Sequence, residues 1–267
     1  MARGIGERTA VIAVTSGKGG VGKSTVSLNV ALALAEGGAA VGLLDADFYG
    51  PDIPLMVNLK RSAPLSRWML GRSAERGPLA LEPVERYGIQ IMSVGFLIAE
   101  SQAMTLPAPL LQGALRQLVG DVEWGDPDYL VVDLPPGTGD LQQEVLGVAR
   151  VAGAVIVVGP QDVAHLDGRK VLDLLRGRGV RVLGGVENMR TLTCPHCGNA
   201  VEVFPAADEA RSIWAEGVRR LGSIPLAPPI ALAGDRGVPV LVADPRGEHA
   251  EAFRGVAAAI VDALGEG

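Results

Sequence analysis

Several residue types are scarce in this sequence, and each scarcity excludes some fold classes or cellular settings. Only two of the 267 residues are cysteines, Cys194 and Cys197, and no export signal precedes the first apolar run. We therefore expect a reducing, cytoplasmic setting and no structural disulfide. Aromatic residues make up only 4% of the chain, whereas 36 residues are glycines, so packing must depend on aliphatic strands and close helix contacts. That balance favours a layered α/β fold over an all-β sandwich.

Strong positive charge and long apolar runs are also missing. The formal net charge is −6 and the isoelectric point is about 5.2, so the bulk charge predicts no nucleic-acid partner. The longest apolar run, around residues 151–159, is far shorter than the roughly 20 residues that span a bilayer. The sequence therefore predicts no membrane segment.

Hydrophobic periodicity predicts an α/β fold with a doubly wound, mostly parallel sheet. A continuous apolar run at 11–14 is typical of a strand buried on both faces. A helical pattern at 24–36 follows it and leads into a second strand at 39–44. This order predicts a right-handed βαβ unit whose ligand-binding loop lies at the carboxyl edge of the sheet.

The alternation of strands and helices continues through the rest of the chain. Further strands are expected at 129–134, 154–158 and 180–186, and further helices at 167–176 and 248–264. Residues 59–83 lack periodicity and are expected to form a loop or a short accessory excursion. With 48% hydrophobic residues, the 267 residues can bury one large core, so we expect a single domain over 1–267.

The loop after the first strand carries a phosphate-binding motif. Residues 17–24 read Gly-Lys-Gly-Gly-Val-Gly-Lys-Ser, which satisfies the P-loop pattern between a strand and a helix. Its glycines let successive backbone N–H groups and the helix N-terminus point at phosphate oxygens. Lys23 is expected to meet the β- and γ-phosphates of ATP, and Ser24 to bind Mg²⁺. The predicted nucleotide contacts are Gly17, Lys18, Gly19, Gly20, Val21, Gly22, Lys23 and Ser24.

Three aspartates follow predicted strands at the same edge of the sheet. Asp45 and Asp47 end the second strand, where a carboxylate can orient water for attack on a γ-phosphate or hold the metal shell. The alternative for Asp47 is a cap on the turn at 49–51. Asp133 ends an apolar strand and is a Walker B candidate for the Mg²⁺ sphere. The Pro- and Gly-rich residues 134–140 are expected to form a switch loop.

The two cysteines form a C-x-x-C pair, expected within an insertion around 190–205. Its spacing lets two thiolates meet at one metal centre, but zinc and cuboidal iron–sulfur clusters both prefer four ligands. A chain with no other cysteine must borrow two ligands from an identical partner, which predicts a homodimer bridged by a cluster, with [4Fe–4S] favoured. The competing interpretations are a redox dithiol and a mononuclear site completed by His196. His165 and His249 have no supporting neighbours in the sequence and are expected to play no catalytic part.

Together these motifs resemble the Mrp/ApbC-type iron–sulfur cluster carrier ATPases, which are relatives of MinD, ParA and the nitrogenase iron protein. The resemblance covers nearly the whole chain. The matching segments are GKGGVGKST at Gly17–Thr25, GLLDADFYGPDIP at 42–54, DYLVVDLPPGTGD at 128–140, QDVAHLD at 161–167, VENM at 186–189, CPHCG at 194–198 and LGSIPL at 221–226.

The resemblance implies a P-loop NTPase with a deviant Walker A motif that ends at Thr25. Lys18 then corresponds to the additional lysine that reaches the partner's phosphates across a nucleotide-sandwich dimer, which makes it a catalytic residue together with Asp47 and Asp133. Asp47 corresponds to the switch I aspartate. By the same resemblance, Asn188 reads the adenine and Pro225 lies in the loop that flanks the base.

The function implied by the resemblance is cluster delivery to apo client proteins, coupled to slow ATP hydrolysis. The alternative is a positioning ATPase of the MinD/ParA kind, which acts on a membrane or on DNA. A membrane-cycling relative needs a basic amphipathic C-terminal helix, but residues 248–267 contain Arg254 as their only arginine or lysine. The sequence shows no dense basic cluster, although Arg211, Arg219 and Arg220 could form a small one, so neither a membrane nor a nucleic acid is expected as a partner.

Overall fold

The computed structural model describes residues 5–59, 81–97, 107–194 and 196–266. Its centre is an eight-stranded sheet with the order β10–β7–β6–β1–β5–β2–β4–β3. All neighbouring strands in it are parallel except β3, which runs antiparallel to β4 at the edge. The strands are β1 (Ala10–Thr15), β2 (Val41–Asp45), β3 (Val84–Arg86), β4 (Ile89–Ser93), β5 (Tyr129–Asp133), β6 (Val151–Val158), β7 (Val182–Asn188) and β10 (Arg220–Ile224).

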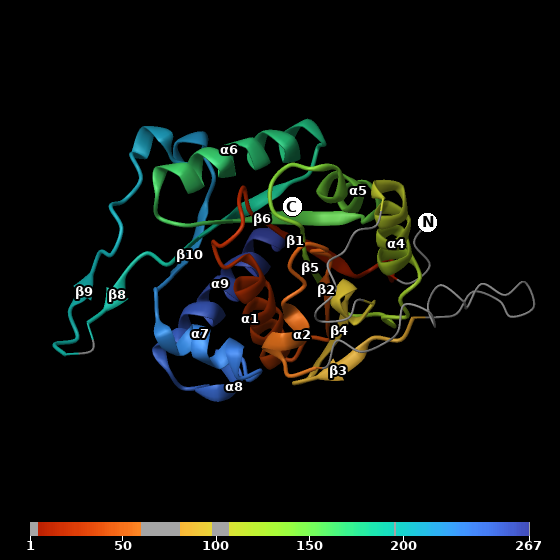
Figure 1. The fold of residues 1–267 in the computed structure, drawn as a ribbon, viewed down its shortest axis with the longest axis horizontal. Helices are drawn as coiled ribbons and strands as arrows, with labels where there is room; N and C mark the ends of the chain where they lie inside the picture. The colour runs from red at the N-terminus through yellow and green to blue at the C-terminus, as the bar shows by residue number, and fades with distance from the viewer. Residues whose placement is uncertain (1–4, 60–80, 98–106, 195, 267) are drawn as a thin grey trace, which may run out of the picture.

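Helices cover both faces of this sheet (Figure 1). One face carries α4 (Ala108–Gly120), α5 (Asp140–Val148) and α6 (Asp162–Gly177). The other carries α1 (Lys23–Glu36), α2 (Ile53–Met56), α7 (Pro228–Asp235), α8 (Val240–Ala243) and α9 (Glu248–Gly265); α1 packs on β2 and β5, and α9 packs beside it on β7 and β10. The 3₁₀ turns are η1 (Val94–Leu97), η2 (Glu209–Arg211) and η3 (Trp214–Glu216). Within the described ranges, no helix combines the length and apolar character needed to cross a bilayer.

The central strands lie between the two helix layers and are mostly apolar up to their last residues, which are Thr15 in β1, Asp45 in β2 and Asp133 in β5. In β1 and β5 every residue but the first is buried, as expected for parallel strands covered on both faces. Helix α1 is also buried on most sides because it packs on the sheet and against α8 and α9, and it ends where Gly38 adopts a left-handed φ of 94°. The predicted doubly wound, mostly parallel sheet is therefore confirmed.

The predicted elements are all present, with shifted ends. Helix α6 begins at Asp162 and not at 167, and β6 begins at Val151 and not at 154. The short strands β3, β4 and β10 were not expected from the sequence, nor were α4, α5 and α7. The predicted loop at 59–83 falls mostly outside the described residues, although Leu81 forms a parallel bridge with Val122.

A small hairpin leaves the main sheet after β7 and carries the cysteine pair. Its strands β8 (Leu192–Thr193) and β9 (Ala200–Val201) pair antiparallel with each other. They form a separate two-stranded sheet. Figure 1 shows this hairpin extending to one side of the helices and the main sheet.

The topology gathers the predicted site residues at one edge. The phosphate loop follows β1, which lies between β5 and β6 in the centre of the sheet. Asp45 ends β2 and Asp133 ends β5, and these two residues are direct partners in the parallel register. Because parallel strands end at the same edge, both carboxylates lie beside the loop.

Candidate nucleotide site and cysteine hairpin

Three of the four glycines in the phosphate loop, Gly17, Gly20 and Gly22, could not be replaced without strain or collision. Gly20 and Gly22 have φ values of 80° and 82°, in the region that side chains disfavour. A Cβ on Gly17 would collide with the backbone of Asp167 on α6, and one on Gly22 would collide with the side-chain amide of Asn188. Around Gly19, by contrast, nothing lies within 4 Å of a Cβ position. The loop is therefore packed against the protein on one side and open on the other.

The start of α1 has the donor set that a phosphate group needs. The N-cap residue is Gly22, and within the described part of the chain no side chain caps the start of this helix. These N–H groups have no partner within the helix either, so they and the positive end of the helix dipole favour an anion. The residues present therefore fit the triphosphate of a nucleotide.

Lys23 begins α1 and lies among carboxylates. Its Nζ is 2.9 Å from Asp133 Oδ1 and 3.4 Å from Asp47 Oδ2, and its side chain is only 6% exposed. Burial opposes the charge, yet the carboxylates of Asp133 and Asp47 outweigh it and raise the pKa of Lys23 above its ordinary value. Lys23 therefore stays protonated and can exchange these carboxylates for phosphate oxygens.

Asp133 is a buried acceptor for two hydroxyl groups of α1. Ser24 Oγ donates to Asp133 Oδ2 and Ser27 Oγ donates to Asp133 Oδ1, both at 2.7 Å. A hydroxyl and a carboxylate side by side are hard oxygen ligands of the kind that Mg²⁺ prefers, so Ser24 and Asp133 fit the predicted metal position. Ser27 was missed in the sequence, although it lies one helical turn after Ser24 and so shares its face.

Asp45 is fully buried behind these groups. Its Oδ1 accepts from the backbone N–H of Asp47 at 3.2 Å, and its Oδ2 accepts from Ser93 Oγ at 2.7 Å. Burial, together with the nearby charge of Asp133, raises the pKa of Asp45 well above its usual range. Both oxygens already have protein donors, so a direct place for Asp45 in the metal shell stays a prediction.

Asp47 caps the following turn, which is the alternative that the sequence analysis left open, while its catalytic role stays a prediction. Its Oδ1 caps the following turn by accepting from the N–H groups of Tyr49 at 3.1 Å and Gly50 at 3.3 Å. Its Oδ2 faces Lys23. Burial raises the pKa of Asp47, although Lys23 works in the opposite direction. The carboxylate is thus held in one orientation at the end of β2.

The switch loop after β5 is attached directly to the phosphate loop. The N–H of Gly137 donates to the carbonyl of Ser16 at 2.8 Å. Gln142 Nε2, on α5, donates to Thr15 Oγ1 at the end of β1 at 2.6 Å. A displacement of the phosphate loop would therefore also displace the start of α5.

The predicted adenine contacts lie at the ends of two paired strands. Asn188 ends β7, and its Nδ2 donates to the carbonyl of Val21 in the phosphate loop at 2.8 Å. Pro225 follows Ile224, which is the register partner of Asn188 in β10. The two predicted residues are thus brought to the same edge, beside the phosphate loop.

Lys18 and Thr25 occupy the two ends of the loop motif. Lys18 is half-buried, and among the described residues no carboxylate lies within ion-pair distance of its ammonium group. Ser16 Oγ donates to the Lys18 carbonyl at 3.0 Å and fixes the backbone there. Thr25 is also half-buried, and its carbonyl accepts from Asn29 Nδ2 at 2.8 Å. The Lys18 ammonium group is therefore available to a partner outside the described chain.

The cysteine pair lies at the tip of the β8–β9 hairpin. Cys194 closes the turn, because its N–H donates to the Asn199 carbonyl and its carbonyl accepts from the Gly198 N–H, both at 2.9 Å. Both cysteines are free thiols; Cys197 is exposed and Cys194 is half-buried. The backbone N–H groups of His196 and Cys197 point at the Cys194 sulfur and lower the pKa of that thiol, which favours the thiolate that binds metals. Among the described residues, no three His, Cys, Asp or Glu side chains gather to hold a metal ion.

The expectation that His165 lacks supporting neighbours is wrong. The side chain is fully buried on α6, and its Nδ1 accepts from the N–H of Ile213 at 3.3 Å. Its ring meets the ring of Trp214 edge-on at 5.6 Å, and its Nε2 lies 3.8 Å from Glu187 Oε1 on β7. The sequence could not reveal these neighbours, since Glu187 comes from β7 and the consecutive residues Ile213 and Trp214 from the start of η3, both far from His165 along the chain.

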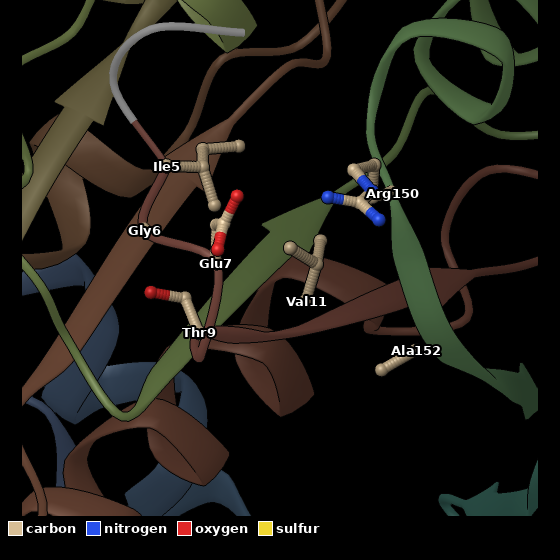
Figure 2. Close-up of a pocket in the computed structure, with 7 residues that line it drawn as sticks. All are labelled: Ile5, Gly6, Glu7, Thr9, Val11, Arg150 and Ala152. Carbon is tan, nitrogen blue, oxygen red and sulfur yellow. The ribbon is translucent and has the colours of Figure 1, made fainter. Parts of the chain in front are cut away.

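A pocket of about 330 Å³ lies at the opposite edge of the sheet (Figure 2). It is found where β1 and β6 begin, whereas the phosphate loop follows the end of β1. Figure 2 shows the side chains of Glu7 and Arg150 on opposite sides of it. The pocket is therefore separate from the nucleotide site. Its lining residues are Ile5, Gly6, Glu7, Thr9, Val11, Arg150 and Ala152.

Comparison with known proteins matches this chain over almost its full length. The sequence model of the ParA family, described as NUBPL iron-transfer P-loop NTPase, matches residues 7–261. A protein named iron-sulfur cluster carrier protein from Synechocystis sp. is 43% identical over 254 residues, which are 95% of this chain and 70% of that protein. The iron-sulfur cluster transfer protein NUBPL from Mus musculus is 42% identical over 256 residues, which are 95% of this chain and 77% of that protein.

Solved structures match the fold. The nucleotide-binding protein from Archaeoglobus fulgidus, in complex with ADP, has a TM-score of 0.71 and 36% identity, and the match covers 93% of this chain and 92% of that one. The cell division ATPase MinD from Pyrococcus furiosus has a TM-score of 0.71 at 21% identity and covers 95% of this chain and 98% of its own. At that identity MinD shows the fold alone, which is that of the P-loop NTPases.

Proposed function

The chain belongs to the family of NUBPL iron-transfer P-loop NTPases, and from this premise we propose that it is an ATP-dependent carrier that delivers an iron–sulfur cluster to apoproteins. The observation that carries the proposal is that the end of β7 is connected both to the phosphate loop and to the cysteine hairpin. Its last residue, Asn188, binds the phosphate loop, and the cysteine hairpin follows four residues later at Leu192. A nucleotide site and a metal-binding thiol pair therefore share one strand end.

The nucleotide step uses the residues gathered at the carboxyl edge. The N–H groups at the start of α1 bind the phosphates, and Lys23 leaves Asp133 and Asp47 to meet the β- and γ-phosphate oxygens. Ser24 and Asp133 hold Mg²⁺, which neutralises phosphate charge when it is bound. Asp47 then orients the attacking water, since phosphoryl transfer needs positioning more than covalent chemistry. Slow turnover suits a site that resets a conformation.

The cargo step uses a second copy of the chain. Cys194 and Cys197 supply two thiolates, and a [4Fe–4S] cluster takes four, so two hairpins together complete the set. Lys18 from each copy reaches the phosphates of the other, so that ATP brings the two subunits together. Hydrolysis separates them again and lets the cluster pass to an apo client protein.

Anaerobic reconstitution with iron and sulfide tests this proposal. The wild type is expected to gain visible absorbance and about two irons per chain, as a shared four-iron cluster requires. The double variant Cys194→Ala/Cys197→Ala should bind ATP normally but hold no cluster. The matched control is His196→Ala, which changes the residue between the cysteines and should keep the cluster. Equal iron in the double variant, or one zinc per dimer with no cluster, would overturn the proposal.

The alternative of a membrane- or DNA-positioning ATPase has less support. In α9 the apolar side chains of Phe253, Val256 and Ile260 are buried against the rest of the protein and are not available to a lipid surface. The one arginine of this helix, Arg254, is paired with Glu36 and Glu251. We also propose that residues 1–267 form a single domain, with the hairpin as an insertion around 190–205.

A further inference from the structure

The side chain of one arginine, Arg190, bridges the end of β7 and the returning strand of the cysteine hairpin. The guanidinium group of Arg190 lies between two carboxylates: its Nη1 is 3.2 Å from Glu187 Oε1, and its Nη2 is 3.3 Å from Glu202 Oε1. Glu187 belongs to β7, whereas Glu202 follows β9 directly. Arg190 therefore joins the strand that ends at the nucleotide site to the returning strand of the hairpin.

Glu187 holds its side of this bridge firmly because it is buried. Its side chain is 6% exposed, and a buried carboxylate is stable only when it is paired. Arg220 Nη1 approaches its other oxygen at 3.7 Å, but Arg220 also stacks on the ring of Trp214. Arg190 is the closer of the two cations, so its guanidinium group stays at the end of β7.

The end of β7 also contacts the phosphate loop. Glu187 and Asn188 are consecutive in β7, so their side chains point to opposite faces of the sheet. Asn188 binds the Val21 carbonyl on one face, and Glu187 binds Arg190 on the other. Met189, which separates Asn188 from Arg190, has a φ of 62°, a conformation that costs energy for any residue other than glycine. The junction is therefore held by its neighbours and responds when they move.

We propose that Arg190 is a positioning residue, which transmits the state of the nucleotide site to the cysteine hairpin through its ion pair with Glu202. A nucleotide that shifts the phosphate loop moves Asn188, and with it Glu187 and Arg190. The hairpin follows because Glu202 is bound to the same guanidinium group. The inference rests on the proposed function, in that it assigns a purpose to the closeness of the ATP site and the thiol pair.

The expected strength of the coupling follows from the exposure of the Glu202 side chain. Glu202 is 58% exposed, and an ion pair with one exposed partner contributes at most about 1 kcal/mol, which corresponds to about a fivefold change in an equilibrium. Loss of the pair should thus weaken the coupling between the two sites about two- to fivefold. It should leave the fold and the nucleotide affinity unchanged.

The experiment measures how nucleotide changes the reactivity of the thiols. The cluster-free, reduced protein is alkylated with N-ethylmaleimide at one pH, once with and once without Mg²⁺ and a non-hydrolysable ATP analogue. Mass spectrometry gives the alkylation rates of Cys194 and Cys197, and for each cysteine the rate with nucleotide is divided by the rate without it. In the wild type we expect a ratio clearly different from one. In Glu202→Gln and Arg190→Gln, this ratio of rates should be two- to fivefold closer to one than in the wild type. In Arg190→Lys, which keeps the positive charge, the ratio should stay near the wild-type value.

Two controls separate coupling from mere support of the hairpin. Glu209→Gln removes another exposed carboxylate, one that pairs with Arg220 at 3.5 Å and not with Arg190, and should keep the wild-type ratio. If Arg190 only supports the hairpin, Glu202→Gln will raise both rates equally and leave the ratio unchanged, which would overturn the inference. A wild-type ratio of one would overturn it as well. Cluster content after reconstitution is a separate measurement, so failure of the carrier proposal is recognised independently.

Discussion

The side-chain amide of Asn188 donates to the backbone carbonyl of Val21 across 2.8 Å and so joins β7 to the phosphate loop. The two residues are far apart in the sequence, and β6 lies between β7 and β1 in the sheet. The amide can approach so closely only because Gly22, the next residue in the loop, has no side chain. One glycine thus serves both the curvature of the loop and its contact with β7.

Replacing that glycine tests the contact. Gly22→Ala should lower the melting temperature more than Gly20→Ala, measured by thermal unfolding without nucleotide. Both positions have a left-handed φ, so both variants carry backbone strain of about 1–3 kcal/mol. Only the Cβ at Gly22 also collides with Asn188, because nothing lies within 4 Å of a Cβ at Gly20. The double variant Gly22→Ala/Asn188→Ala should recover part of the loss, and equal melting temperatures for the two single variants would contradict this account.

A second prediction concerns Ser27. Ser27→Ala removes a buried hydroxyl that donates to Asp133 Oδ1 at 2.7 Å and also lies 3.0 Å from the Lys23 carbonyl oxygen, and should cost about 1–3 kcal/mol of stability in denaturant unfolding. Ser27 contacts Asp133 and has no place among the proposed nucleotide contacts, so nucleotide affinity should change little while ATP hydrolysis falls a few-fold. Ser24→Ala is the comparison, since it removes the donor to the other oxygen and should alter the Mg²⁺ dependence instead. An unchanged unfolding midpoint for Ser27→Ala would show that this hydroxyl is dispensable.

A third prediction concerns Lys18. Lys18→Ala should leave the melting temperature of the nucleotide-free protein unchanged, because no carboxylate among the described residues pairs with its ammonium group. Light scattering after size exclusion should then show that the variant no longer dimerises when ATP is added. Lys170→Ala is a matched control, since Lys170 pairs only with Asp167 on the surface of α6. ATP-dependent dimers of the Lys18 variant would rule out the proposed contact across the interface.

Much of this site could be read from the sequence, because it depends on local patterns. The apolar runs of β1, β2 and β5 and the glycine motif fix where the loop and the aspartates lie. Helix α6 was expected too late because no side chain caps it at Gln161, so its true start has no signal. Strand β4 is no shorter than β2 or β5, but Gln90 interrupts its apolar run, so it lacks the continuous pattern by which the others were recognised.

The parts that escaped prediction depend on strand order. Glu187 and His165 become neighbours only because β7 lies beside β6, which leads into α6. Arg190 and Glu202 meet because the hairpin folds back on itself. Such pairings are set by packing between distant segments, and a single sequence carries no periodic trace of them.

A fourth prediction follows from Glu187. The neighbouring imidazole of His165 and the guanidinium groups of Arg190 and Arg220 lower the pKa of Glu187 below its ordinary value of 4.5. A carboxylate whose pKa is lower in the folded state adds stability above its unfolded pKa and loses it as the pH falls through the folded value. Glu187→Gln should therefore melt at a lower temperature than the wild type near about pH 7, and the difference should shrink below about pH 4.5.

Thermal unfolding across this pH range provides the measurement. Glu209→Gln, at an exposed position, should show little difference from the wild type at any pH, because exposed ion pairs contribute little. A melting-temperature difference for Glu187→Gln that stays constant with pH would mean that the charge of Glu187 does not matter.

The central position of β1 has a consequence for biosynthesis. Its first residue, Ala10, pairs with Tyr129 of β5, and Val11 pairs with Val151 of β6. At a translation rate of about 5–20 residues per second, the first strand waits roughly 6–24 s for its first neighbour to be made. During this interval an apolar segment is exposed beside the ribosome, where chaperones can bind it. The predicted nucleotide site thus stays incomplete until β5, which ends with Asp133, has emerged.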